Sequence, residues 1–370
     1  MQEQSSQFSL PFVKQFFDKI FNSKLRKTHY ENLCRSVFGL ISSQSGLISE
    51  IARPITRENS VSFKHTLKRT CRFLANVGFK PEKVLVLWVK WSASQFASEN
   101  RLRIAIDWTT LPGNIQCLMA AIPFHGRAIP IYFRITPYGE FEKSQNIIEE
   151  HFLKSLIRML PKEIRPVIIA DRGFGRAALF RFFLSLSRDF PLDFAIRVKS
   201  EVWVTMESGV RRKLSRMKIK PDRSRWYQNI TYREDGLVSG VNLAAAATED
   251  SLDYWFVITN LTDKEETISL YAERFQIEEF FKDGKHQLGI ADMQTPDRKR
   301  IYRLVCIACL SYGLLTIVGR TLEEHKDVQN KLIVADKQKR ISYIWLALKA
   351  IRHNLIGAPI WQEALATLGP

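Results

Sequence analysis

Glycine and proline are scarce in this sequence, with 17 and 14 among 370 residues, whereas 45% of the residues are hydrophobic. This composition excludes a collagen-like, low-complexity or disordered chain and fits a globular protein of two or three domains. Acidic residues are also scarce, since 38 Asp and Glu stand against 55 Lys and Arg and leave a net charge of +17. Such a surplus favours a polyanionic partner, above all nucleic acid.

Cysteine is rare as well, and the five cysteines are scattered and odd in number. They fit a reducing compartment, and we expect a cytoplasmic protein. Cys306 and Cys309 have the spacing of half a zinc site, but no second Cys or His pair lies nearby, so we expect core packing. The start MQEQSSQFSLPF predicts no signal peptide. The uncharged and strongly apolar run 304–319 has 16 residues, fewer than the ~20 of a membrane span, so we expect a buried helix and no membrane.

The first quarter of the chain is basic and has helical periodicity. Residues 1–97 carry 15 basic and 6 acidic residues, a net charge of +9. In the helix expected over 61–76, Phe63, Leu67 and Leu74 form an apolar stripe. The other face is cationic, with Lys64, Lys68, Arg69 and Arg72. We interpret 1–97 as a helical DNA-binding domain, and a merely solvated helix face is the alternative.

From Arg101 onward, segments of alternating apolar residues predict three consecutive antiparallel strands joined by tight turns. A helix over 144–160, a buried strand, a helix over 176–188 and a further strand follow. The order βββαβαβ predicts an α/β protein with a ribonuclease-H-like core. The expected regions are the first part of the core over 98–200, a β-rich insertion over 201–262, a further core helix over 263–290 and a C-terminal helical region over 291–370.

Two aspartates stand at the ends of buried strands of this core. Asp107 follows the apolar Ile104 and Ile106, and Asp171 ends the strand RPVIIAD. A carboxylate there is costly unless something pairs with it, and a metal ion would do so. The first and fourth strands of the predicted topology are neighbours, so we expect Asp107 and Asp171 to meet although 64 residues separate them. The alternative for each is a turn or helix-cap residue.

A third carboxylate lies on the helix ISLYAERFQIEEFFKDGKHQLG. At ~100° per residue, four polar side chains share one face of this helix through successive turns. These are Tyr271, Arg274, Glu278 and Lys285. An exposed face of ion pairs is the alternative interpretation.

The same residues resemble the DDE transposases of bacterial insertion sequences that carry a Tyr-Arg-Glu-Lys (YREK) signature. Asp107 in IDWTT and Asp171 in ADRGFG match the two aspartates of that family, and Tyr271, two residues, Arg274, three residues, Glu278, six residues and Lys285 match the signature. The resemblance covers about 98–290. It implies an enzyme that cuts DNA at the ends of an insertion sequence and joins them to target DNA.

For the chemistry, the resemblance implies a catalytic triad of Asp107, Asp171 and Glu278. The triad would hold two Mg²⁺ ions, with Mn²⁺ able to substitute, for two-metal-ion phosphoryl transfer. The partners implied are the terminal inverted repeats of the element and target DNA, bound by a homodimer in the DNA complex. We expect association with the nucleoid and no nucleotide cofactor, because the sequence has no GxxxxGK[ST] phosphate loop.

For DNA binding, the resemblance implies that Tyr271, Arg274 and Lys285 hold backbone phosphate. It also implies that Trp255, in the insertion segment YWFVITN, stacks on a base flipped near the cleaved end. The alternative for Trp255 is an ordinary core aromatic on a strand.

Two other functions share these features. A ribonuclease-H-like nuclease or resolvase without strand transfer would use the same carboxylates, and only the Tyr-Arg-Lys companions and the basic N-terminal region argue against it. A catalytically silent DNA-binding protein derived from a transposase is the second alternative, and the intact triad argues against it.

Overall fold

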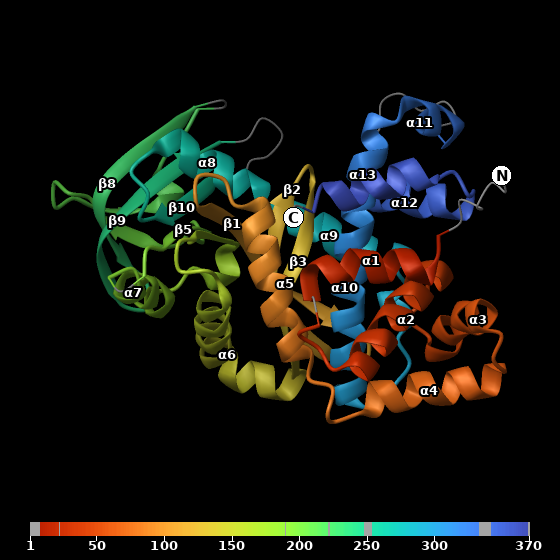
Figure 1. Ribbon diagram of the computed structural model, residues 1–370. Helices are drawn as coiled ribbons and strands as arrows, with labels where there is room; N and C mark the ends of the chain where they lie inside the picture. Colours follow the sequence, from red (N-terminus) through yellow and green to blue (C-terminus); the bar gives the residue numbers. More distant parts are fainter. Residues whose placement is uncertain are drawn as a thin grey trace.

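A large mixed sheet extends from β8 (Ser224–Arg233) and β9 (Leu237–Ala246) at one edge of the molecule to β3 (Arg127–Pro137) beside a body of helices (Figure 1). The computed structural model describes residues 8–21, 23–188, 190–220, 223–247, 254–332 and 342–368, with the side chains of 59 and 141–143 left aside. The prediction of a mixed α/β protein is confirmed.

The middle of the chain follows the predicted element order. The elements are β1 (Arg101–Leu111), β2 (Ile115–Phe124), β3 (Arg127–Pro137), α6 (Tyr138–Met159), β4 (Arg165–Ala170), α7 (Ala177–Leu186) and β5 (Asp193–Arg197). At the β2–β3 turn, His125 and Gly126 both have positive φ, as a two-residue type I′ hairpin requires. Helix α6 begins six residues before the expected Ser144, directly after Pro137. This arrangement is consistent with a ribonuclease-H-like core.

The ten strands of the described residues form one sheet in the order β3-β2-β1-β4-β5-β10-β9-β8-β6-β7. Strand β1 is antiparallel to β2 and parallel to β4, and β4 is parallel to β5. The strands of the predicted insertion continue the same sheet, because β10 pairs antiparallel with β5. They are β6 (Trp203–Thr205), β7 (Arg211–Lys213), β8 (Ser224–Arg233), β9 (Leu237–Ala246) and β10 (Trp255–Thr259).

Helices from the two ends of the chain pack together beside the sheet (Figure 1). The first group is α1 (Leu10–Phe21), α2 (Lys27–Ser43), α3 (Ile48–Asn59), α4 (Phe63–Ala75) and α5 (Pro81–Phe96). The second group is α10 (Arg298–Glu324), α11 (Lys326–Leu332), α12 (Tyr343–Arg352) and α13 (Ala358–Ala366). Helix α10 contacts α2, α4, α5, α12 and α13, and it therefore forms the axis of this helical body.

Helix α10 contains the expected apolar run. Among the described residues it is the one helix long and apolar enough to cross a membrane, but 94% of its most apolar window is buried inside the protein. Cys306 and Cys309 are buried in it as free thiols, so the prediction of core packing is confirmed. The helix is the core of the helical body.

The expected single helix around Glu278 is divided into α8 (Lys264–Glu273) and α9 (Phe275–Gln287). The division falls at Arg274, whose N–H donates to the carbonyl of Tyr271 in a tightened turn. Helix α8 packs on β4, β5, β9 and β10, and α9 packs on β1, β2 and β3. The break therefore lets the two halves cover different parts of the sheet.

Candidate active site

The two predicted aspartates lie at the same edge of the sheet. Strands β1 and β4 pair in parallel as far as Ile106 and Ala170, and Asp107 and Asp171 are the next residues along the two strands. Parallel strands end at one edge of a sheet, so the backbone brings both aspartates to neighbouring positions. The sequence predicted this juxtaposition.

Arg274 joins one of the aspartates, Asp107, to the predicted glutamate. Its Nη2 donates to Glu278 Oε1 at 2.7 Å, and its Nη1 lies 3.5 Å from Asp107 Oδ2. Asp171 is reached through Tyr271, whose hydroxyl donates to Asp171 Oδ1 at 3.1 Å. The side chain of Arg274 is only 4% exposed, whereas that of Glu278 is 43% exposed. Five of the predicted residues thus gather in one region that is open to solvent on the Glu278 side.

The carboxylates influence one another electrostatically. Burial raises the pKa of Asp107 to about 6, and the negative charges of Asp171 and Glu278 act in the same direction. The backbone N–H of Trp108, which donates to Asp107 Oδ1 at 2.8 Å, and the charge of Arg274 act in the opposite direction. The single positive charge of Arg274 therefore compensates only part of the negative charge of Asp107, Asp171 and Glu278.

Tyr271 serves this cluster as a hydrogen-bond donor. Burial, followed by the charge of Asp171, raises the pKa of the Tyr271 hydroxyl to about 12. The hydroxyl therefore keeps its proton at neutral pH and stays available to Asp171. The ring is fully buried against the sheet, so the donor is held in place.

The three carboxyl groups fit a divalent cation by charge and by donor type. Mg²⁺ prefers oxygen ligands of this kind, and a cation would compensate the excess negative charge around Asp107. Across the residues that the structure describes, no three His, Cys, Asp or Glu side chains form a ready metal-binding cluster. Arg274 lies between Asp107 and Glu278 instead. Arg274 therefore supplies the positive charge that lies between these two carboxyl groups.

Lys285 and Trp255 lie at the margins of this region. Lys285 is half-buried near the end of α9 and lines a small apolar cavity with Thr109, two residues beyond Asp107 in β1. The Trp255 ring meets the Tyr271 ring edge to face, with centroids 5.0 Å apart, and the Phe275 ring at 5.8 Å. Trp255 is half-buried, so it is not fully enclosed in the core.

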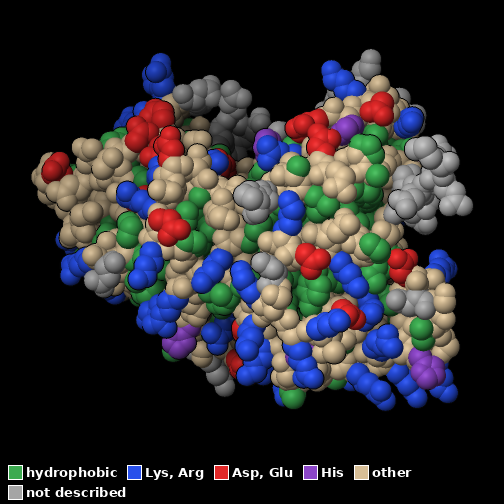
Figure 2. All heavy atoms as spheres, in the orientation of Figure 1, with side chains coloured by type: hydrophobic (Ala, Val, Ile, Leu, Met, Phe, Trp, Pro, Cys, Tyr) green, Lys and Arg blue, Asp and Glu red, His purple; other side chains and the backbone are tan. Residues whose placement is uncertain are grey.

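The predicted basic face of α4 is exposed. Figure 2 shows Lys and Arg side chains gathered over α4 along the lower edge of the molecule. All four predicted side chains on this face are exposed, namely Lys64, Lys68, Arg69 and Arg72. The helix therefore presents its cations to solvent and its opposite face to α3 and α10.

The predicted apolar stripe of α4 is fully buried only at Leu74. Phe63 and Leu67 are only half-buried, and Phe63 lies under the guanidinium of Arg53 in α3 at 5.1 Å. The buried residues of the helix are Thr66, Thr70, Phe73 and Leu74. Hydrophobic periodicity counts only apolar residues, so it did not predict that Thr66 and Thr70 belong to the buried face. The hydroxyl of Thr70 donates to the carbonyl of Thr66, which makes its burial possible.

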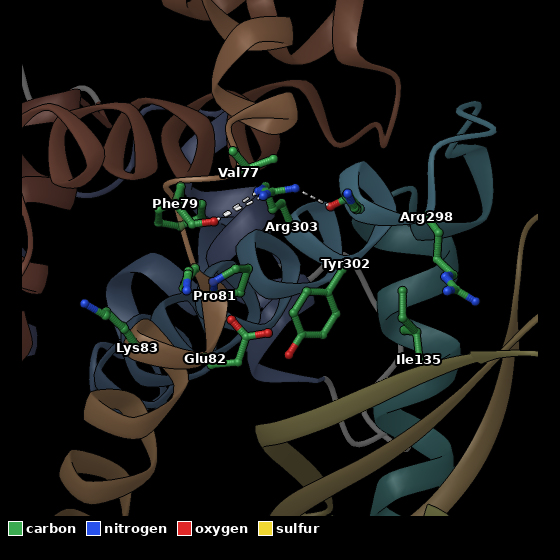
Figure 3. Close-up of a pocket in the computed structure, with 11 residues that line it drawn as sticks. Val77, Phe79, Pro81, Glu82, Lys83, Ile135, Arg298, Tyr302 and Arg303 are labelled. Carbon is green, nitrogen blue, oxygen red and sulfur yellow. Dashed lines mark hydrogen bonds between the residues drawn. The ribbon is translucent and has the colours of Figure 1, made fainter.

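A second basic surface surrounds a concavity of about 570 Å³ between the first turns of α5 and α10 and the end of β3 (Figure 3). Arg303 closes one side, and its Nη2 donates to the carbonyl of Asn76 at 2.7 Å. Tyr302 lies in the concavity with its hydroxyl toward Glu82. The exposed cations at the rim are Lys80, Lys83, Arg298 and Lys299. The rim is therefore strongly positive.

Sequence reasoning missed two residues of the region. Phe275, directly after Arg274, is 39% exposed beside Trp255, and the Arg274 guanidinium lies 4.4 Å from its ring centroid. Glu149 is a fully buried carboxylate on α6 that pairs with Arg176. Its sequence context, IIEEHF, is that of an ordinary amphipathic helix, and only the three-dimensional structure distinguishes it from a solvated glutamate.

The family of the chain is known from its central part. Residues 99–314 match the family model of the transposase DDE domain, which is more than half of the 370 residues. The chain belongs to this family of transposases. No curated protein matches the chain. Members of the family are enzymes of DNA transposition and recombination that act on DNA and generally use divalent metal ions.

Proposed function

We propose that the protein is a transposase of the YREK group of bacterial insertion sequences, which cuts DNA at the element ends and joins them to target DNA by two-metal-ion phosphoryl transfer. The observation that supports this most is the convergence of Asp107, Asp171 and Glu278 from β1, β4 and α9 on one edge of the sheet. The order β3-β2-β1-β4-β5, with β1 parallel to β4, supports a ribonuclease-H-like core.

Asp107, Asp171 and Glu278 would hold two Mg²⁺ ions, or Mn²⁺ in their place. When bound, such ions stabilise charge on the attacking and leaving oxygens of an in-line displacement. In the first step water attacks the phosphorus, the bond to the 3′-oxygen breaks, and a 3′-hydroxyl is released. In the second step this hydroxyl attacks a target phosphodiester, so one ester bond replaces another. The exchange needs no nucleotide as an energy source.

Three side chains around the carboxylates suit the backbone of the bound DNA. Arg274 presents a planar fork of donors that can grip a phosphate in a bidentate manner, and Lys285 supplies a point charge. Tyr271 keeps its proton at neutral pH, since the pKa of its hydroxyl is raised to about 12. Contacts of this type position a scissile phosphate and carry no sequence information.

The two basic surfaces extend this DNA path. In the sheet, Thr109 pairs with Cys117 and Cys117 pairs with Ile135, which lines the basic concavity. Neighbouring strands are ~4.8 Å apart, so Ile135 in β3 lies about two strand spacings from Thr109 in β1. We assign backbone contacts to the rim of the concavity and recognition of the terminal repeats to the exposed face of α4. Further parts of the proposal are a homodimer in the DNA complex and a cytoplasmic, nucleoid-associated location.

The proposal is tested by incubating the protein and Mg²⁺ with DNA that carries the ends flanking its own gene and then mapping the products. We expect breaks at the element ends that leave 3′-hydroxyls, followed by joining of these ends to a second DNA. Breaks without joining would favour the nuclease or resolvase. Binding without breaks would favour the catalytically silent derivative.

Trp255→Ala should separate base stacking from core packing. If Trp255 stacks on a flipped base, the variant loses ~1–3 kcal/mol of stacking energy at the cleaved end, and first-strand nicking survives while later steps slow. If Trp255 is a core aromatic, the variant loses ~3–5 kcal/mol of folding free energy instead. We expect the first result, because Trp255 is only half-buried, whereas a core aromatic would be fully enclosed. Strand-resolved cleavage and thermal melting of the same variant decide between them, and a large loss of melting temperature with all steps equally impaired would exclude stacking.

Replacing Lys68 and Arg72 on α4 by alanine should weaken binding of element ends and lower the salt dependence of binding. The slope of log K against log salt should fall by about 0.9 for each phosphate that the helix no longer neutralises. Lys326→Ala with Lys331→Ala is the matched control, because these exposed lysines of α11 lie at the opposite edge of the molecule. An unchanged slope in the α4 variant, or an equal change in both variants, would show that α4 does not contact DNA.

A further inference from the structure

A fully buried carboxylate lies behind the candidate active site, on the opposite face of the sheet. Glu149 of α6 is 0% exposed. Its Oε1 accepts hydrogen bonds from Trp108 Nε1 at 2.8 Å and from Gln145 Nε2 at 2.9 Å. Its Oε2 pairs with the guanidinium of Arg176, whose side chain is 12% exposed. All of these partners approach a single carboxyl group inside the protein.

Two of the partners belong to the segments that carry the catalytic aspartates. Trp108 is the residue after Asp107 in β1, and successive side chains of a strand point to opposite faces. Asp107 therefore faces Arg274 and α9, while Trp108 faces α6 and Glu149. Arg176 ends the segment that begins at Asp171 and directly precedes α7. Glu149 therefore contacts the residue that follows Asp107 in β1 and the last residue of the segment that begins at Asp171.

The backbone pairing between these segments stops just before the site. The last paired residues of β1 and β4 are Ile106 and Ala170, so this ladder does not fix Asp171 relative to Asp107, which is itself paired with Met119 of β2. The far end of the Asp171 loop is fixed to the insertion, because the Tyr232 hydroxyl donates to the carbonyl of Gly175 at 2.9 Å. That contact does not reach β1. Among the side-chain contacts described, those of Glu149 join the two segments directly.

A contribution to folding stability does not account for the burial of the Glu149 carboxylate. A buried ion pair often contributes no more to stability than well-packed apolar residues of the same volume, since desolvation offsets the attraction. Its distinctive property is directional, because one carboxyl group with three donors fixes the relative position of the elements that carry them.

We propose that Glu149 is a positioning residue of the phosphoryl-transfer centre, which sets the spacing of Asp107 and Asp171 through Trp108 and Arg176. The inference rests on the proposed function, because it assigns the two aspartates to one metal-dependent centre. Residues that orient metal ligands from behind typically change metal affinity or activity by ~10–100-fold when they are replaced.

The molecule offers a matched control at the other end of the same strands. Asp193, at the start of β5, is 1% exposed and pairs with Arg165 at 2.6 Å and with Arg101 at 3.3 Å. These arginines begin β4 and β1. Asp193 therefore joins the same strands with the same chemistry, but at the edge of the sheet away from Asp107 and Asp171. Asp193→Asn should lower the melting temperature and leave the chemistry intact.

The experiment compares Glu149→Gln, Trp108→Phe and Asp193→Asn in the full-length protein, below their melting temperatures. Glu149→Gln keeps the shape and an acceptor for Trp108 but removes the charge that pairs with Arg176. We expect its turnover on saturating end DNA to fall ~10–100-fold and its Mn²⁺ affinity, followed by electron paramagnetic resonance without DNA, to fall over the same range. The dissociation constant for end DNA should not change. Trp108→Phe should shift turnover and Mn²⁺ affinity in the same direction by a smaller factor.

Wild-type turnover and Mn²⁺ affinity in Glu149→Gln would overturn the inference. An equal loss in Asp193→Asn would also overturn it, because the effect would then follow from any buried ion pair. If the wild-type protein itself shows no Mg²⁺-dependent cleavage, the proposed function fails, and the Mn²⁺ affinities of the variants still test the role of Glu149. Should Glu149→Gln not fold, Trp108→Phe decides the question, and unchanged Mn²⁺ affinity in it would count against the inference.

Discussion

Replacing Asp107, Asp171 or Glu278 by its amide should abolish strand cleavage while binding of element ends remains. Each amide keeps the size of the side chain but removes the charge that a divalent cation needs. Loss of the metal contribution should lower the cleavage rate by more than about 10³-fold, or about 4 kcal/mol of transition-state stabilisation. Binding should remain because the basic surfaces on α4 and around the concavity are unchanged. Single-turnover cleavage and equilibrium binding on the same end DNA measure both quantities.

Glu279→Gln is the matched control for the glutamate. Glu279 is the next residue of α9, but it pairs with Lys282 at 2.5 Å and with Arg127 at 3.6 Å, away from Arg274. We expect this variant to cleave at close to the wild-type rate. A variant of Asp107, Asp171 or Glu278 that still cuts at that rate would remove its residue from the triad, and inactivity of Glu279→Gln alone would move the triad to Glu279.

Asp107→Asn should make the metal-free protein more stable at pH 8, although we expect it to abolish cleavage. Burial raises the pKa of Asp107 to about 6 from an ordinary value of 3.8, so the folded state binds the proton more tightly than the unfolded chain. Wild-type stability therefore falls as pH rises from about 4 to about 6, and the cost stays constant above that range. A shift of about two pKa units corresponds to at most about 3 kcal/mol. The asparagine variant avoids this cost.

Urea unfolding in the presence of a chelator, repeated between pH 4 and pH 8, measures this effect. The two proteins should converge near pH 4, where Asp107 is protonated in the folded state, and diverge above pH 6. Asp193→Asn is the contrasting variant, because Asp193 has two arginine partners and its loss should destabilise the protein at pH 8. Equal stability of wild type and Asp107→Asn at pH 8 would show that the buried carboxylate is not strained.

The sequence predicted that the two aspartates are neighbours, but it did not predict how the sheet continues beyond β5. The order of strands β1 to β5 follows from short-range patterns, and the adjacency of β1 and β4 then places Asp107 beside Asp171. The continuation of the sheet through β10 was not predictable in this way. Its pairing joins Arg197 to Val257, 60 residues away, and no local pattern specifies such a partner.

The signature helix shows a second limit of sequence reasoning. Its periodicity correctly placed Tyr271, Arg274 and Glu278 in one region, but it gave no sign of the break at Arg274. The polar face also lies deeper than an amphipathic pattern suggests, since Tyr271 is 0% exposed and Arg274 is 3% exposed. The Tyr271 hydroxyl is satisfied by Asp171, and the two terminal nitrogens of Arg274 contact Asp107 and Glu278. Arg274 Nε is buried without a hydrogen-bond partner in the part of the chain that the structure describes. Burial of this kind depends on partners from distant parts of the chain.

The central claim is that Asp107, Asp171 and Glu278 hold one metal centre, and the most direct test locates the metal without relying on activity. Fe²⁺ placed in the Mg²⁺ site and treated with ascorbate and peroxide generates hydroxyl radicals that cut the polypeptide beside its ligands. We predict fragments that end near residues 107, 171 and 278 together, suppressed by excess Mg²⁺ and absent in Asp107→Asn. Cuts that are scattered along the chain, or that persist unchanged in excess Mg²⁺, would contradict a shared metal centre.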